Sequence, residues 1–101
     1  MSRPKYWWYD YVKKSIMRNL GTGTAPETWQ EYLCDKAVKN VLARTKGQYR
    51  GEERLKMIDL VYRKRQHNVP GAAVQLHIAE TTACEWSKEF VYAVAKEMGF
   101  L

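Results

Sequence analysis

The residue types that most often bind metals or perform catalysis are few and far apart in this chain. Cys34 and Cys84 lie 50 positions apart and form no CxxC pair, and His67 and His77 have no partner at a metal-ligand spacing. The glycine loop that cradles phosphates and the GxSxG and HExxH motifs do not occur. We therefore predict two reduced thiols, no metal, no cofactor and no enzymatic activity.

Positive charge is the chemical feature that the sequence does carry. The 101 residues hold 17 Lys and Arg against 11 Asp and Glu, a formal net charge of +6. Basic residues predominate in residues 1–20 and 36–65, whereas residues 21–35 and 66–101 are net negative. Such a surplus suits a polyanionic partner, because contacts with phosphates release counterions. The candidate phosphate contacts are Lys13, Lys14, Arg18, Arg63, Lys64 and Arg65.

The elements that must position these residues are predicted to be helices, because apolar residues recur every third or fourth position. A first helix is expected over residues 5–20. Its inward side comprises Trp8, Val12, Ile16 and Leu20, widened by Trp7 and Tyr11. A second helix is expected to begin with a capping box formed by Thr24 and Glu27 and to stop at residues 45–48. Its inward side comprises Trp29, Leu33, Ala37, Val38, Val41 and Leu42.

Three further helices are predicted in the second half of the chain. They span residues 51–66, 70–76 and 80–98, and the first of them directs Leu55, Ile58, Val61 and Tyr62 inward. In the last, the inward residues are Ala83, Trp86, Phe90 and Val94. The chain is too short for two domains. We therefore predict one all-α domain, a compact bundle of about five helices in which residues 1–66 form a three-helix support and residues 67–101 hold a helix-turn-helix and the C-terminal helix.

The helix-turn-helix prediction depends on residues 70–98. Apolar residues on either side of a short turn have the spacing of this motif, namely Ala73, Leu76, Ile78, Ala83 and Trp86. The turn, where this pattern often has Gly, holds His77, so we expect an unusual backbone angle or a different turn there.

In this interpretation the second helix of the motif enters the major groove of DNA. The candidate base contacts are Thr81, Thr82, Glu85 and Lys88. Thr can hydrogen-bond base edges or touch a thymine methyl group, Glu can accept from cytosine, and Lys can bind guanine. Because the helix also carries Glu80 and Glu89, basic residues elsewhere must supply the affinity for phosphates.

The stretch from Ile58 to Leu101 resembles the C-terminal half of small phage-encoded transcriptional regulators of the RinA and ArpU types. The similarity lies in IDLVYRKR before the motif, GAAVQLHIAETTA through it, and WxxxF with VAKEMGF after it. It covers the last 44 residues well and the first 57 poorly, although YWWYDYVKKSI is loosely similar too.

The resemblance implies an all-α fold, a motif similar to sigma-factor region four that binds DNA through its second helix, and control of late phage genes. It puts Thr81, Thr82, Glu85 and Lys88 on exposed positions of the recognition helix, and Ala83 and Trp86 on packing positions. This chain departs from the family at Cys84 and Glu85, where Arg or Lys is expected. Such an activator can also touch RNA polymerase.

We therefore predict a phage or prophage regulator that binds double-stranded DNA in the cytoplasm, with a homodimer as a plausible assembly. The alternatives are a small terminase-like subunit for DNA packaging, and a protein-only adaptor that contacts RNA polymerase. For the adaptor, the interface would use aromatic residues such as Trp7, Tyr9, Tyr49 and Tyr92. No apolar run is long enough to span a bilayer, and the N-terminus lacks the apolar region of a signal peptide.

Overall fold

The computed structural model describes residues 7–22, 27–64 and 68–100, and all its elements in these ranges are helical. This confirms the predicted all-α fold. The elements are α1 (Tyr9–Thr22), α2 (Trp29–Lys46), α3 (Gly51–Ile58), the π-helical segment η1 (Asp59–Arg63), α4 (Val69–Leu76) and α5 (Glu80–Glu97). The helical stretch that follows residue 50 ends at Arg63, and its predicted last turn at residues 65–66 lies outside the described residues.

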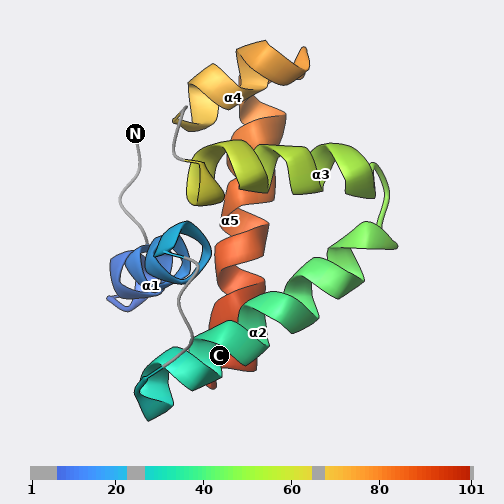
Figure 1. Cartoon of the computed structure of the whole chain (residues 1–101). Helices are drawn as coiled ribbons and strands as arrows, with labels where there is room; N and C mark the ends of the chain where they lie inside the picture. Colours follow the sequence, from blue (N-terminus) through green and yellow to red (C-terminus); the bar gives the residue numbers. More distant parts are fainter. Residues whose placement is uncertain (1–6, 23–26, 65–67, 101) are drawn as a thin grey trace.

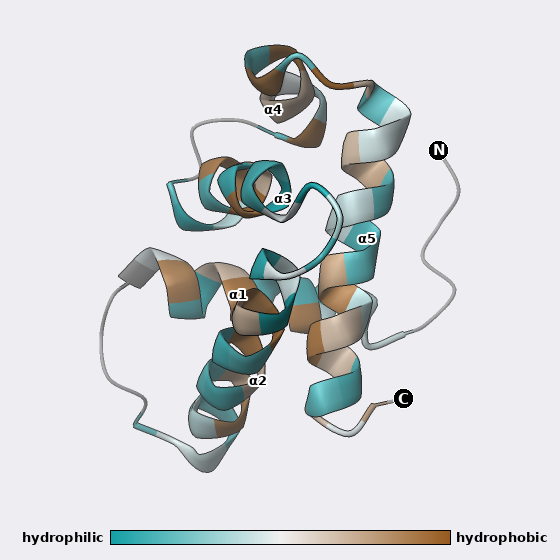
Figure 2. Cartoon of the chain, turned by 90° about the vertical axis from the view of Figure 1, so that its right-hand side faces the viewer, coloured by the Kyte–Doolittle hydropathy of each residue, from teal (hydrophilic) through white to brown (hydrophobic). Residues whose placement is uncertain are grey.

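Helix α5 is the central element, and the other helices pack around it (Figure 1). Helix α4 lies across the leading end of α5, α3 crosses its upper half, and α1 and α2 pack against its lower half. Seen from a second side, α4 again lies at one end of the molecule and the beginning of α2 at the other (Figure 2). The α4–α5 turn and the beginning of α2 are therefore at opposite ends.

One continuous apolar core holds the helices together. Most of the predicted inward residues are buried in it, including Trp8, Val12, Ile16, Ala37, Val38, Val41, Ile58, Val61, Tyr62, Ala83, Trp86, Phe90 and Val94. Met57 on α3 is also fully buried, although the spacing of apolar residues did not predict it as a core residue. The π-type turn that follows Ile58 closes with a hydrogen bond from the Lys64 amide to the Asp59 carbonyl at 2.8 Å.

Three aromatic residues that were predicted to face inward are exposed instead. The exposed fractions are 83% for Trp7, 42% for Tyr11 and 70% for Trp29. A series with a spacing of four residues drifts by about 40° per step around an α-helix. Trp29 is therefore rotated by about 120° from Val41 and points away from the core.

Helix α2 begins later than predicted. Its N-cap is Thr28, whose hydroxyl oxygen accepts a hydrogen bond from the Glu31 amide at 3.1 Å, while the Glu31 carboxylate accepts from the Glu27 amide at 2.9 Å. Thr24 lies outside the described residues. The prediction that the helix starts at Thr24 was wrong because Thr28 and Glu31 offer the same capping chemistry four residues later.

The connection between α2 and α3 depends on Gly51. A Cβ atom at this position would lie 2.4 Å from the Thr45 carbonyl oxygen and 2.6 Å from that of Lys46, so only glycine fits. The preceding Arg50 adopts a left-handed backbone with φ of 54°, and its guanidinium pairs with Glu53. This tight turn sets how α3 crosses α5.

Candidate nucleic-acid interface

The turn between α4 and α5 is built by backbone hydrogen bonds around His77. This residue has a left-handed backbone, with φ of 57° and ψ of 43°, which confirms the predicted unusual angle. Its amide donates to the Val74 carbonyl at 3.2 Å and the Ile78 amide donates to the Ala73 carbonyl at 3.0 Å. This pair of bonds is a Schellman ending. It stops α4 sharply, so that only His77, Ile78 and Ala79 separate the two helices.

The start of α4 is fixed by a side-chain cap. The Asn68 carboxamide oxygen accepts from the Gly71 amide at 2.9 Å, and Pro70 occupies the first turn, where an amide would have no helical partner. The buried Ala72 and Ala73 allow α4 to approach α5 and α3 closely. Both ends of α4 are therefore fixed by local hydrogen bonds, at the Asn68 cap and at the His77 ending.

Helix α5 has one buried and one exposed side. The buried side faces the core through residues such as Ala83, Trp86, Phe90 and Val94. On the opposite side, an exposed stripe runs along the first three turns, formed by Thr81, Cys84, Glu85 and Lys88. Thr82 is half-buried at the edge of this stripe. Three of the four predicted base contacts thus lie together on one open face, and the fourth borders it.

The predicted phosphate contacts fall into two groups. Arg63 and Lys64 are exposed at the end of η1, which contacts α4, and both lie near the Asp59 carboxylate, at 3.6 and 3.3 Å. Arg65, predicted with them, lies outside the described residues.

The second group lies on α1. Lys13 is half-buried, Lys14 and Arg18 are exposed, and Arg18 is 3.7 Å from Glu31. Helix α1 meets α5 through its first residue, Tyr9, whose ring centroid is 5.8 Å from that of Tyr92. Tyr92 is about 18 Å along the helix from the leading end of α5. The beginning of α1 therefore lies beside the C-terminal half of α5.

Two acidic residues of α5 pair with arginines of neighbouring helices. Glu89 accepts from Arg54 of α3 at 2.7 Å, and Glu97 accepts from Arg44 of α2 at 2.5 Å. Among the described residues, the acidic groups left on α5 without such a pair are Glu80 and Glu85. The sequence suggested that the exposed side of α5 is more acidic than it is in the structure, where Glu89 is paired. The position of Glu89 between the buried Trp86 and Phe90 is the signal that could have shown this.

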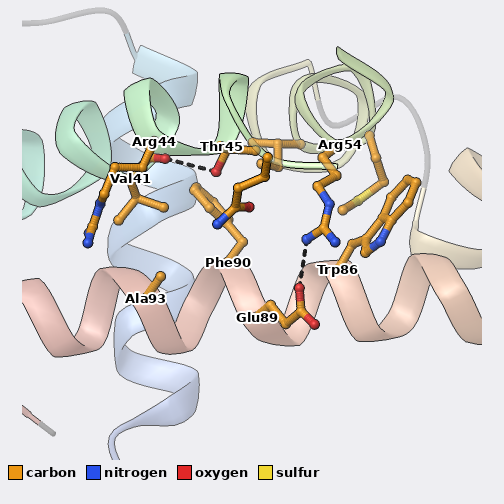
Figure 3. Close-up of a pocket in the computed structure, with 11 residues that line it drawn as sticks. Val41, Arg44, Thr45, Arg54, Trp86, Glu89, Phe90 and Ala93 are labelled. Carbon is orange, nitrogen blue, oxygen red and sulfur yellow. Dashed lines mark hydrogen bonds and ion pairs between the residues drawn. The ribbon is translucent and has the colours of Figure 1, made fainter. Parts of the chain in front are cut away.

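A cavity of about 130 Å³ lies behind this helix, between α2, α3 and α5. Its walls include the core residues Val41 and Phe90, and Arg54 reaches across its edge to Glu89 beside the Trp86 ring (Figure 3). Arg54 and Glu89, the two charged residues at this edge, are already paired with each other.

The nucleophilic and titratable groups in the core are held in their neutral forms. Burial raises the pKa of the Cys34 thiol to about 11 and that of the Tyr62 hydroxyl to about 12. Cys34 and Cys84 are both free thiols. Within the described ranges, no group of three or more His, Cys, Asp and Glu residues could hold a metal ion, and no helix is long and apolar enough to cross a membrane.

No protein-family model, no curated protein and no solved structure matches this chain.

Proposed function

We propose that this protein is a DNA-binding transcriptional regulator that places the exposed stripe of α5 in the major groove. The observation that supports this most strongly is the stripe itself. Thr81, Glu85 and Lys88 lie on an open face directly after the left-handed turn, while the opposite face of α5 is packed into the core. Two helices joined by a short turn, with the second presenting polar side chains, is the arrangement of a helix-turn-helix.

The charge distribution supports a polyanionic partner. The chain carries a formal net charge of +6, and Arg63 and Lys64 lie on the element that precedes α4. Asp59 partly neutralises them, but their side chains are each 54% exposed and can reach a phosphate. Glu89 and Glu97 pair with arginines of the same chain. Helix α5 therefore repels DNA phosphates less than its acidic composition suggests.

The biological setting that we propose is a phage or a prophage. It rests on the resemblance of residues 58–101 to regulators of the RinA and ArpU types. In this proposal the partner is double-stranded DNA, the bases are read by Thr81, Thr82, Glu85 and Lys88, and contact with RNA polymerase follows DNA binding.

Selection of bound sequences from a random duplex pool tests the proposal. We expect one motif to be enriched, and we expect Thr81→Ala and Lys88→Ala to relax the preference at single positions by about 1–3 kcal/mol. Lys96→Ala is the matched control, because Lys96 is exposed near the far end of the same helix. An unenriched pool would overturn the proposal in favour of a protein-only adaptor, and an enriched motif that neither stripe variant alters would show that a surface other than α5 reads the DNA.

A further inference from the structure

Helix α2 presents an exposed stripe on the side that faces away from the core. We call it the outer stripe of α2, and it comprises Trp29, Tyr32, Lys36, Lys39 and Ala43, all of which are exposed. These positions follow one another at alternating spacings of three and four residues, which is the spacing of a helix–helix seam. In a single copy of the chain this seam has no partner helix among the described residues.

The outer stripe is chemically divided into two halves. Its first half holds the stacked rings of Trp29 and Tyr32, whose centroids are 5.5 Å apart and which are 70% and 48% exposed. Its second half holds Lys36 and Lys39, and Lys39 also reaches back to Asp35 at 2.9 Å. Two large rings exposed side by side are unusual for a surface that only meets water.

We propose that this stripe is a self-association surface on which a second copy of the chain docks with its α2 antiparallel to the first. About a two-fold axis, Trp29 then lies opposite Lys39 of the second copy, and Tyr32 lies opposite Lys36 of the second copy. A single antiparallel register places both of these pairs opposite each other. Each ammonium group meets the face of an aromatic ring, and each lysine stem covers apolar ring surface.

The charges around the stacked rings favour a second copy over a nucleic acid. The stacked rings lie within residues 21–35, which carry Glu27, Glu31 and Asp35 and no basic residue. Arg18 and Lys39 of the same copy partly neutralise Glu31 and Asp35, at 3.7 and 2.9 Å, but the segment keeps a negative charge that disfavours a polyanion beside the rings and attracts the lysines of a second copy. An isologous contact requires a surface that is complementary to itself, and the outer stripe, aromatic at one end and cationic at the other, has this property.

The proposed contact is compatible with DNA binding but does not depend on it. The beginning of α2 lies at the end of the molecule away from α4 (Figures 1 and 2), so the exposed stripe of α5 stays open in both copies. In this register the two α2 helices overlap only over residues 29–39 and bury less area than the roughly 800 Å² per partner of a standard interface, so we expect a dimer that dissociates on dilution.

Sedimentation equilibrium of the full chain without DNA, over a concentration series, tests the proposal separately from the proposed function. We expect a monomer–dimer equilibrium that Trp29→Ala and Lys39→Glu each weaken at least tenfold. The matched controls are Tyr49→Ala, which removes an 82% exposed ring elsewhere, and Lys96→Glu, which makes the same charge change on α5. A monomer at every concentration, or a dimer that both stripe variants leave unchanged, would overturn the proposal.

Cross-linking through single introduced cysteines tests the orientation, in a Cys84→Ser background that leaves only the buried Cys34. In the proposed register, the two copies of residue 36 lie about 6 Å apart along the helix axis, and the two copies of residue 43 about 27 Å apart. We therefore expect Lys36→Cys to cross-link and Ala43→Cys not to do so. Cross-linking of both variants indicates parallel helices and contradicts the proposed pairing. If Trp29→Ala weakens DNA binding but not self-association, the rings form a platform for nucleic acid instead.

Discussion

The guanidinium of Arg54 on α3 lies over the indole ring of Trp86 on α5, with its central carbon 5.1 Å from the ring centroid. The same guanidinium donates to Glu89 one turn further along α5, and its Nε donates to the Tyr49 carbonyl at 2.9 Å. Only 18% of the Arg54 side chain is exposed. This residue therefore joins α3 to the back of the helix that we propose as the DNA reader.

Replacement of Arg54 tests how much this junction contributes to the fold. We expect Arg54→Ala to lower the free energy of unfolding by about 1–2 kcal/mol, measured by urea denaturation, because a cation–π contact and two hydrogen bonds are lost. The pairing with Glu89 adds little, since that carboxylate is 60% exposed. Lys56→Ala, an exposed change on the same helix, is the control. Equal effects of the two variants would show that the junction is not stabilising.

The buried hydroxyl pair of Tyr62 and Ser87 predicts a pH dependence. Burial raises the pKa of Tyr62 from 10.0 to about 12, and the hydroxyl is 2.5 Å from that of Ser87. Above pH 10 the unfolded chain loses this proton while the folded chain keeps it, so stability falls as the pH rises from 10 towards 12.

Tyr62→Phe removes both the hydrogen bond and this titration. Below pH 10 we expect the variant to be about 1–2 kcal/mol less stable than the parent, because Ser87 is left without its partner. At about pH 11 this difference in stability should shrink. Only the parent contains the Tyr62 hydroxyl, whose ionisation in the unfolded chain lowers the stability of the parent at that pH. Urea denaturation at the two pH values measures both effects. A difference that stays constant or grows would contradict the burial of the Tyr62 hydroxyl.

The turn before α3 predicts a sharp contrast between two glycines. Gly51→Ala would force a Cβ atom against two backbone carbonyls, so we expect a loss of about 1–3 kcal/mol or more. At Gly47 a Cβ atom would lie an ordinary 3.7 Å from the Arg44 carbonyl oxygen, and Gly47→Ala should change stability by less than about 1 kcal/mol. Thermal unfolding of the two variants compares them directly. Similar losses at both positions would contradict the close approach of α2 and α3.

The two groups of predicted phosphate contacts should differ in their effect on DNA binding. Arg63 and Lys64 lie on the element next to α4, so the double change to Ala should reduce the slope of log affinity against log salt by up to about 2. The same double change at Lys13 and Lys14, on α1, should have a smaller effect. Fluorescence anisotropy with one duplex over a salt series measures both slopes. The opposite order would place the DNA along α1.

Much of the fold was predictable from sequence because its helices are amphipathic and their ends carry strong local signals. The pattern around Trp86, Phe90 and Val94 predicted the buried side of α5. At the turn, where the pattern often has Gly, we expected either an unusual backbone angle at His77 or a different turn, and the left-handed backbone is the first of these. Trp29 was assigned wrongly because a four-residue spacing drifts around the helix, by about 120° between Trp29 and Val41.

The site was less predictable, because its properties depend on contacts between distant residues. Sequence placed Thr81, Thr82, Glu85 and Lys88 on exposed positions; three of them are exposed, and Thr82 is half-buried. It did not reveal that Glu89 is paired with Arg54, since those residues are 35 positions apart. Nor did it show that α1, which carries the second group of predicted phosphate contacts, begins beside Tyr92 of α5, because helix packing decides that placement.

The most direct test of the central claim is an NMR titration of the isotope-labelled protein with a duplex selected from the random pool. We predict that the largest amide shifts occur from Glu80 to Lys88 on α5, with a second group at Arg63 and Lys64. Shifts confined to α2, or no shifts at all on addition of the duplex, would contradict the assignment of α5 as the DNA-reading helix.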